Sequence, residues 1–125
     1  MLLHNMNKAR TKRKETESAL QASIFQVINL ILSKDVLITC FPSGGGGKIR
    51  GARLKRMGLS SGWPDLQLIY KGKYYGIEVK TSVGKLSSAQ SELHKRLSDQ
   101  GAKVAVVKSE KEAMDLIYEW NLHKK

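Results

Sequence analysis

The sequence predicts a single α/β domain over residues 17–125, with the element order α-β-β-β-α-β-α. Apolar residues recur at helical spacing near the N-terminus, and two alternating runs meet at Gly72, as the strands of a hairpin do. Segments opened by Ser87 and Ser109 then lie on either side of a valine-rich run, a pattern typical of two helices around a strand. The length of 125 residues is usual for one domain and is enough for one hydrophobic core.

The N-terminal part is predicted to contain a leader, a helix, a short strand and a long loop. Residues 1–16 form a basic leader that we expect to be poorly ordered. Val36–Phe41 is a β-like run closed by Pro42, and residues 43–62 are basic, glycine-rich and aperiodic, so we expect mostly loop there. The first helix, over residues 17–33, is predicted from an apolar stripe made of Leu20, Ile24, Val27, Ile28 and Ile31.

Residues 65–70 and 74–81 are predicted to pair as an antiparallel hairpin. Gly72 suits the first central position of a type II′ turn, which requires positive φ. With that turn, Asp65 lies opposite Lys80, and one face of the hairpin becomes almost wholly apolar. A different register would mix the two faces.

Two helices and a strand complete the predicted domain. A capping box over Ser87–Gln90 opens a helix, which ends where Gly101 supplies a left-handed residue. A strand follows over residues 103–108. A second capping box over Ser109–Glu112 opens a final helix that runs to about Asn121.

Three charged side chains gather at the open end of the predicted hairpin. Glu78 and Lys80 point to the same side of their strand, roughly 7 Å apart, and Asp65 joins them from the neighbouring strand. Two converging carboxylates suit Mg²⁺, to which the backbone carbonyl of Val79 could add an oxygen. A lysine beside them can orient a metal-bound water and stabilise charge on phosphorus. A solvated, salt-bridged sheet face would show the same spacing.

The chain is strongly basic, with 22 Lys and Arg residues against 11 acidic residues and a net charge of +11. This excess favours a polyanionic partner, because each neutralised phosphate releases counterions. Basic runs that are only solvated tails are the alternative interpretation. The candidate DNA-binding residues are Lys12, Arg13 and Lys14 in the leader, Lys48, Arg50, Arg53, Lys55 and Arg56 after the glycine run, and Lys85.

The composition disfavours several classes of protein. Cys40 is the single cysteine, which excludes an internal disulfide framework and fits a reducing, cytoplasmic compartment; we expect its side chain to be buried. No apolar run approaches the ~20 residues of a membrane span, and no fingerprint of a nucleotide cofactor is present. The histidines, His94 included, show no metal-ligand spacing. Trp63 is expected to pack under the turn rather than to stack on a base.

An ordered set of motifs extends from about Glu17 to Lys108. These motifs are Glu17 on the first helix, Gly62-Trp63-Pro64-Asp65, Glu78-Val79-Lys80, Gly84-Lys85-Leu86-Ser87-Ser88-Ala89-Gln90, and the strand Gly101–Val107. With them the chain resembles the VRR-NUC (virus-type replication-repair nuclease) family of the PD-(D/E)XK nuclease superfamily, as a stand-alone phage-type member.

The resemblance implies a restriction-endonuclease-like core with a central mixed sheet flanked by helices. It implies hydrolysis of DNA phosphodiester bonds with Mg²⁺, for which Mn²⁺ can substitute, by an intracellular homodimer that acts on branched DNA such as four-way (Holliday) junctions. Asp65 and Glu78 would be metal ligands, and Lys80 would be the catalytic lysine. A non-catalytic nucleic-acid-binding module of the same fold and an RNA-processing nuclease are the alternatives.

Two further residues have two interpretations each. Glu17 shares the apolar stripe of the first helix, so it either completes the metal site as a third acid or favours the helix N-terminus. Gln90 either reaches the active centre, as the family pattern suggests, or only closes the capping box with Ser87. We favour the metal-site role for Glu17 and leave both roles of Gln90 open.

Overall fold

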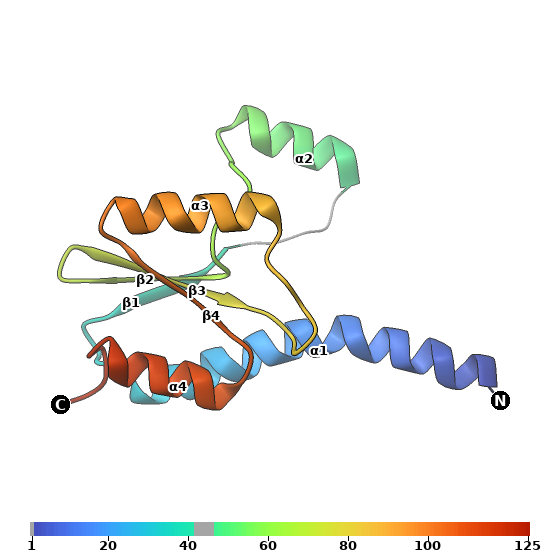
Figure 1. Ribbon diagram of the computed structural model, residues 1–125, viewed down its shortest axis with the longest axis horizontal. Coiled ribbons are helices and arrows are strands. Elements are labelled where there is room, and N and C mark those ends of the chain that lie inside the picture. The colour runs from blue at the N-terminus through green and yellow to red at the C-terminus, as the bar shows by residue number, and fades with distance from the viewer. Residues whose placement is uncertain (1, 42–46) are drawn as a thin grey trace. The chain divides into compact units, whose positions relative to one another are not determined.

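The computed structural model describes residues 2–41 and 47–125, with the side chains of the first helix from Glu17 onward. The described elements follow the order α-β-α-β-β-α-β-α, which adds one helix to the predicted order (Figure 1). A 4-stranded mixed sheet with the order β1-β2-β3-β4 confirms the predicted α/β class. The chain divides into two compact units: the first holds residues up to Val36, 79–84 and 106–125, and the second holds residues 37–78 and 85–105.

In the first unit, α1 (Leu2–Ile31) packs against α4 (Glu110–Glu119). The apolar stripe predicted for the first helix contributes Ile24 and Ile28, and α4 contributes Ile117; all of these side chains are fully buried. Because these side chains lie one helical turn apart, one face of each helix is removed from water. The buried face of α1 is therefore the predicted one.

α1 begins at Leu2 instead of Glu17, so residues 2–16, expected to be a poorly ordered leader, belong to a helix. The expectation of poor order rested on the charge of the segment. The segment contains neither glycine nor proline, and its lysines, arginines and glutamate are good helix formers. None of the helices in the described part of the chain combines the length and apolar character needed to cross a membrane.

In the second unit, β2 (Leu66–Tyr70) and β3 (Lys73–Val79) form the predicted antiparallel hairpin. Lys71 and Gly72 occupy its two-residue turn, with φ values of 50° and 79°. Positive φ at both central residues is the pattern of a type I′ turn, so the predicted type II′ turn is wrong.

The change of turn shifts the partner of every β2 residue relative to the predicted register. Leu66 pairs with Ile77 and Leu68 with Tyr75, where Val79 and Ile77 were expected. The shift equals one full side-chain period along a strand, so the same residues still share a face. Leu66, Leu68 and Ile77 are fully buried, which confirms the predicted apolar face.

The other elements of the sheet and the crossover helix follow the prediction closely. β1 (Leu37–Cys40) pairs antiparallel with β2 and forms one edge of the sheet. α3 (Ser88–Asp99) begins at the predicted capping box, and Gly101 follows its end with a φ of 91°. β4 (Lys103–Val107) comes next. Cys40 is exposed, which corrects the expectation of a buried thiol: an edge strand has a neighbour on one side only.

The largest error of the sequence prediction concerns α2 (Gly47–Arg56), which forms where loop was expected. The helix is followed by Gly58, whose φ is 110°, and the Leu59 N–H donates a 2.9 Å hydrogen bond to the Leu54 carbonyl, as at a glycine-terminated helix end. No residue of α2 is buried, so no apolar stripe signals this helix in the sequence. Residues 42–46, the first part of the predicted loop with its glycine run, lie outside the described residues.

Candidate active site

Asp65 and Glu78 lie in the second unit, Asp65 just before β2 and Glu78 within the neighbouring β3. Asp65 directly precedes β2, and its backbone carbonyl accepts a 2.9 Å hydrogen bond from the Phe41 N–H. The observed pairing of β2 with β3 ends at Leu66 and Ile77, so Asp65 and Glu78 are the next residues beyond the last pair. In the predicted register the residue beside Asp65 was Lys80.

Two glycines allow the segment before Asp65 to pack closely. Gly62 has a φ of 97°, and a Cβ there would lie 2.7 Å from the backbone oxygen of Ala89 in α3. A Cβ at Gly76 of β3 would lie 2.5 Å from Cγ of Pro64. Real Cβ atoms do not approach other atoms so closely, so both positions require glycine. These two contacts fix the segment that carries Asp65 against α3 and β3.

A chain of hydrogen bonds holds the backbone of Pro64, the residue before Asp65. The Tyr74 hydroxyl donates to the side-chain oxygen of Gln67, whose amide nitrogen donates to the Pro64 carbonyl. Burial raises the pKa of Tyr74 from 10.0 to about 12, so the hydroxyl keeps its proton and stays a donor. Trp63 packs edge-on against Tyr74 with 6.1 Å between ring centroids, as its expected packing role requires.

Glu78 is buried and hydrogen-bonded to α3. Its exposed fraction is 2%, and its Oε2 accepts a 3.2 Å hydrogen bond from Nε2 of Gln90. The Oε1 of Gln90 accepts a 2.9 Å hydrogen bond from the Ser87 N–H and closes the capping box. The capping interpretation of Gln90 is confirmed, and its nitrogen also contacts Glu78; its role in an active centre stays a prediction.

His94 is a residue of this site that the sequence analysis missed. It is 9% exposed, and its Nε2 lies 4.0 Å from Oε1 of Glu78. His94 follows Gln90 by four residues on α3, so both side chains project from the same face of the helix. The sequence feature that could have identified His94 was therefore its four-residue separation from Gln90, and not a spacing between histidines.

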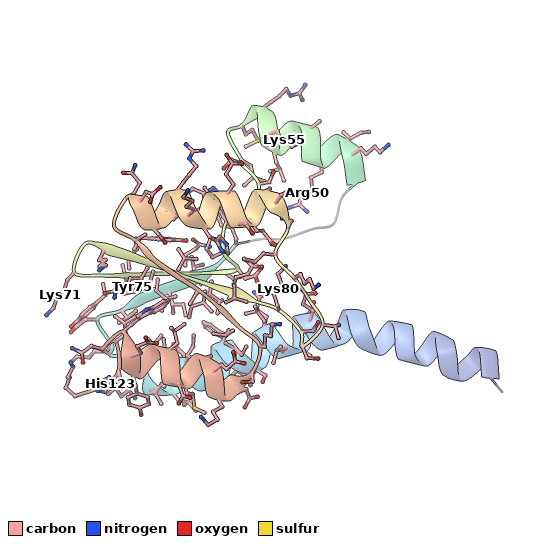
Figure 2. All side chains as sticks on the ribbon, viewed as in Figure 1. Arg50, Lys55, Lys71, Tyr75, Lys80 and His123 are labelled. Atoms are coloured by element: carbon pink, nitrogen blue, oxygen red, sulfur yellow. The ribbon has the colours of Figure 1, made fainter. Side chains whose placement is uncertain are left out.

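Lys80 and Glu17 belong to the first unit. Lys80, labelled in Figure 2, directly follows β3, and its N–H donates a 3.0 Å hydrogen bond to the Val107 carbonyl. The Glu17 side chain is exposed, which corrects its expected place on the buried stripe of α1. Glu17 lies in helical phase with the apolar stripe, but its side chain is not buried. The metal-site role of Glu17 stays a prediction.

The donor set of the second unit suits a hard divalent cation. Asp65, half-buried, and Glu78, buried, offer carboxylate oxygens, and such oxygens are the ligands that Mg²⁺ and Mn²⁺ prefer. Among the described residues, no three His, Cys, Asp or Glu side chains gather as a metal site. The two carboxylates therefore fit an ion with waters and substrate phosphate as its further ligands, and the predicted role of the Val79 carbonyl stays a prediction.

The basic residues predicted to bind DNA lie on α1, on α2 and before α3. Arg50 and Lys55 project from α2 in Figure 2. Lys12, Arg13 and Lys14 belong to α1, and their side chains lie outside the described ones. The exposed members of the set are Lys48, Arg50, Arg53, Lys55 and Arg56 on α2, and Lys85 in the segment before α3.

Comparison with known proteins gives a consistent family. The model of the VRR-NUC domain matches residues 5–111. A solved structure described as a VRR_NUC domain protein is 25% identical, with a TM-score of 0.71 over 87% of this chain and 91% of the other. Another, described as a VRR_NUC domain, is also 25% identical, with a TM-score of 0.59 over 83% of this chain and 96% of the other. No curated protein matches. The chain therefore belongs to the VRR-NUC family and has a nuclease-type fold.

Proposed function

We propose that the chain is a divalent-metal-dependent endonuclease that hydrolyses DNA phosphodiester bonds, preferably in branched DNA such as four-way junctions. The main support is that Asp65 and Glu78, in a nuclease-type domain, are the next residues beyond the last pair of the β2–β3 hairpin. Lys80, two residues beyond Glu78 in the sequence, would supply the cation that such a reaction needs. The preference for branched DNA rests on the family resemblance.

Asp65 and Glu78 are the proposed ligands of Mg²⁺, with Mn²⁺ as a substitute. The bound ion would polarise the scissile phosphate and lower the pKa of a bound water. Glu78 contributes a carboxylate whose orientation is already set, because Gln90 donates to Oε2 and the side chain is buried. A ligand held in advance loses little conformational freedom when the ion binds. Asp65, being half-buried, is accessible to both the ion and a phosphate.

Lys80 is the proposed catalytic lysine. Its ammonium would contact a phosphate oxygen and stabilise the negative charge that develops as water attacks phosphorus. In this reaction a new P–O bond forms to the oxygen of the attacking water, which gives a proton to solvent, while the P–O bond to the leaving group breaks and the leaving oxygen takes up a proton from solvent. The side chain of Lys80 is half-buried, which strengthens its interaction with an anion relative to a fully solvated lysine.

The exposed basic residues would bind the DNA backbone. The net charge of +11 favours any polyanion, and the cations of α2 are all exposed on a helix that buries no residue. Contacts of this kind position a duplex without reading its sequence, as suits an enzyme that selects DNA by shape. We propose that two chains act together, because a four-way junction offers symmetric cleavage positions. Light scattering that shows only monomer, with and without junction DNA, would contradict the dimer.

A cleavage panel tests the proposal. Four-way junctions, forks and linear duplexes of DNA, and the same structures in RNA, are incubated with Mg²⁺, Mn²⁺ or EDTA. Wild-type protein should cut DNA junctions with either metal and not with EDTA, and Asp65→Asn, which keeps the size of the side chain, should bind junctions without cutting them. Binding without cleavage under every metal condition would favour a non-catalytic binding module. Preferential cleavage of RNA would favour an RNA-processing nuclease.

A further inference from the structure

A groove in the second unit lies at the turn end of the hairpin and takes no part in the proposed hydrolysis. Its volume is about 510 Å³, and it is lined on one side by Trp63, Lys71, Lys73 and Tyr74, and on the other by the end of α3, including Leu97. We propose that this groove binds a single-stranded segment of the DNA substrate. The inference rests on the proposed nuclease function and extends it to the unpaired nucleotides of branched DNA.

The aromatic wall of the groove is held in place by its neighbours. Trp63 Nε1 donates a 2.8 Å hydrogen bond to the Ser60 hydroxyl. The Trp63 ring stacks on Phe41, with centroids 6.4 Å apart, and meets Tyr74 edge-on. The Tyr74 ring is held in turn by its hydrogen bond to Gln67. Bases of single-stranded DNA bind by stacking on aromatic side chains, and a fixed ring loses little freedom when a base stacks on it.

The charge of the groove suits a phosphate backbone. Lys71 and Lys73 lie at the tip of the hairpin, where Figure 2 labels Lys71, and no acidic residue is among the described residues of the lining. The ammonium groups rest 5.1 Å and 5.8 Å from the rings of Tyr70 and Tyr75. Cation–π contacts at exposed sites are weak, so either lysine can turn towards a phosphate. Aromatic rings beside cations favour a nucleotide chain over a neutral or basic peptide.

The place of the groove in the chain connects it to the candidate active site. Trp63 lines the groove and lies two residues before Asp65, and Tyr74 lies on β3, which carries Glu78. The groove and the candidate carboxylate site therefore share the β2–β3 hairpin. A strand whose phosphate lay at Asp65 would need only a few nucleotides to reach Trp63. Unpaired nucleotides beside a branch point meet this requirement, whereas a continuous duplex does not.

Tryptophan fluorescence tests the inference without any cleavage step. The chain has 2 tryptophans, so Trp120→Phe leaves Trp63 as the only one. In EDTA, a short oligothymidylate should quench Trp63, and a duplex of equal length should quench it less. Lys71→Ala with Lys73→Ala should lower the slope of log affinity against log salt for the oligothymidylate by about 1.4, because each contact with a single strand contributes about 0.7. The control, Lys124→Ala with Lys125→Ala, removes the same charge from exposed positions of the first unit and should leave the slope unchanged.

Three outcomes would overturn the inference: equal slopes for the two double variants, no quenching of Trp63 at saturating oligothymidylate, or equally tight binding of polyglutamate. The junction-cleavage panel separates this inference from the proposed function. Cleavage by wild-type protein together with equal slopes would remove the groove proposal alone. Quenching and a lowered slope in a protein that cuts nothing with any metal would support the groove and contradict the nuclease proposal.

Discussion

Gly62→Ala should destabilise the fold because the new methyl group has no room and the backbone has an unfavourable φ. The added Cβ would lie 2.7 Å from the Ala89 carbonyl oxygen, and the φ of 97° is one that alanine rarely adopts. Forced overpacking costs about 1–3 kcal/mol, and a left-handed conformation costs about 1–2 kcal/mol for a residue with a Cβ. The lower entropy of the unfolded chain offsets only about 0.4–1 kcal/mol. We therefore expect a net loss of about 1–5 kcal/mol in the free energy of unfolding.

Urea denaturation followed by circular dichroism measures this change, and Gly51→Ala is the matched control. Gly51 lies inside α2, where a Cβ would meet nothing within 4 Å. Alanine is favoured over glycine within a helix by about 0.5–1 kcal/mol, so Gly51→Ala should be neutral or slightly stabilising. An unchanged unfolding midpoint for Gly62→Ala would refute the close packing of the Asp65 segment against α3. A midpoint lowered equally by both substitutions would refute it as well.

Further predictions concern the side chains around Glu78 and Tyr74. Gln90→Leu removes the hydrogen bond to Glu78 and should raise the Mg²⁺ concentration for half-maximal cleavage roughly 10–100-fold. Ser87→Ala, which breaks only the helix cap, should leave that concentration unchanged. Equal effects of the two substitutions would refute the role of Gln90 in orienting Glu78. His94→Leu removes a side chain 4.0 Å from Glu78 and should slow cleavage at equal DNA binding, measured by anisotropy in EDTA; a wild-type rate would assign His94 to packing alone. Since the pKa of Tyr74 is about 12 in the fold against 10.0 outside it, the associated stability is present below pH 10 and is lost as the pH rises towards 12. The free energy of unfolding, measured across that pH range, should therefore fall less steeply for Tyr74→Phe than for wild type. Equal slopes for the two proteins would contradict the raised pKa.

The apolar face of the hairpin could be predicted from the sequence because strand alternation tolerates an error in the turn. Placing the turn at Lys71 and Gly72 changed the partner of Leu66 from Val79 to Ile77. The error equals a full side-chain period, so it left every side chain on its predicted face. The capping box of Ser87 and Gln90 was also open to prediction, since capping geometry depends on local sequence.

Helix α2 and the site residue His94 were not predicted, because neither produces a periodic pattern of apolar residues in the sequence. α2 buries no residue, so its helical propensity and the glycine at position 58 were the only local indications of it. His94 became a site residue through the packing of α3 against β3, which single-sequence spacing does not encode. Glu17 shows the reverse case: it lies in phase with the apolar stripe of α1, yet its side chain is exposed. Helical phase predicts a face, but burial requires a neighbour that covers it.

The most direct test of the metal-dependent nuclease proposal is the single-turnover rate at which Glu78→Gln cuts a four-way junction with Mg²⁺, measured beside wild type. The substitution keeps the size of the side chain and removes its charge. Junction binding in EDTA and the urea midpoint serve as controls for affinity and folding. We predict a rate loss of roughly 100-fold or more, as expected when an electrostatic contact of a transition state is removed, with junction binding retained. Cleavage by Glu78→Gln at the wild-type rate would contradict the assignment of the two carboxylates as the catalytic metal site.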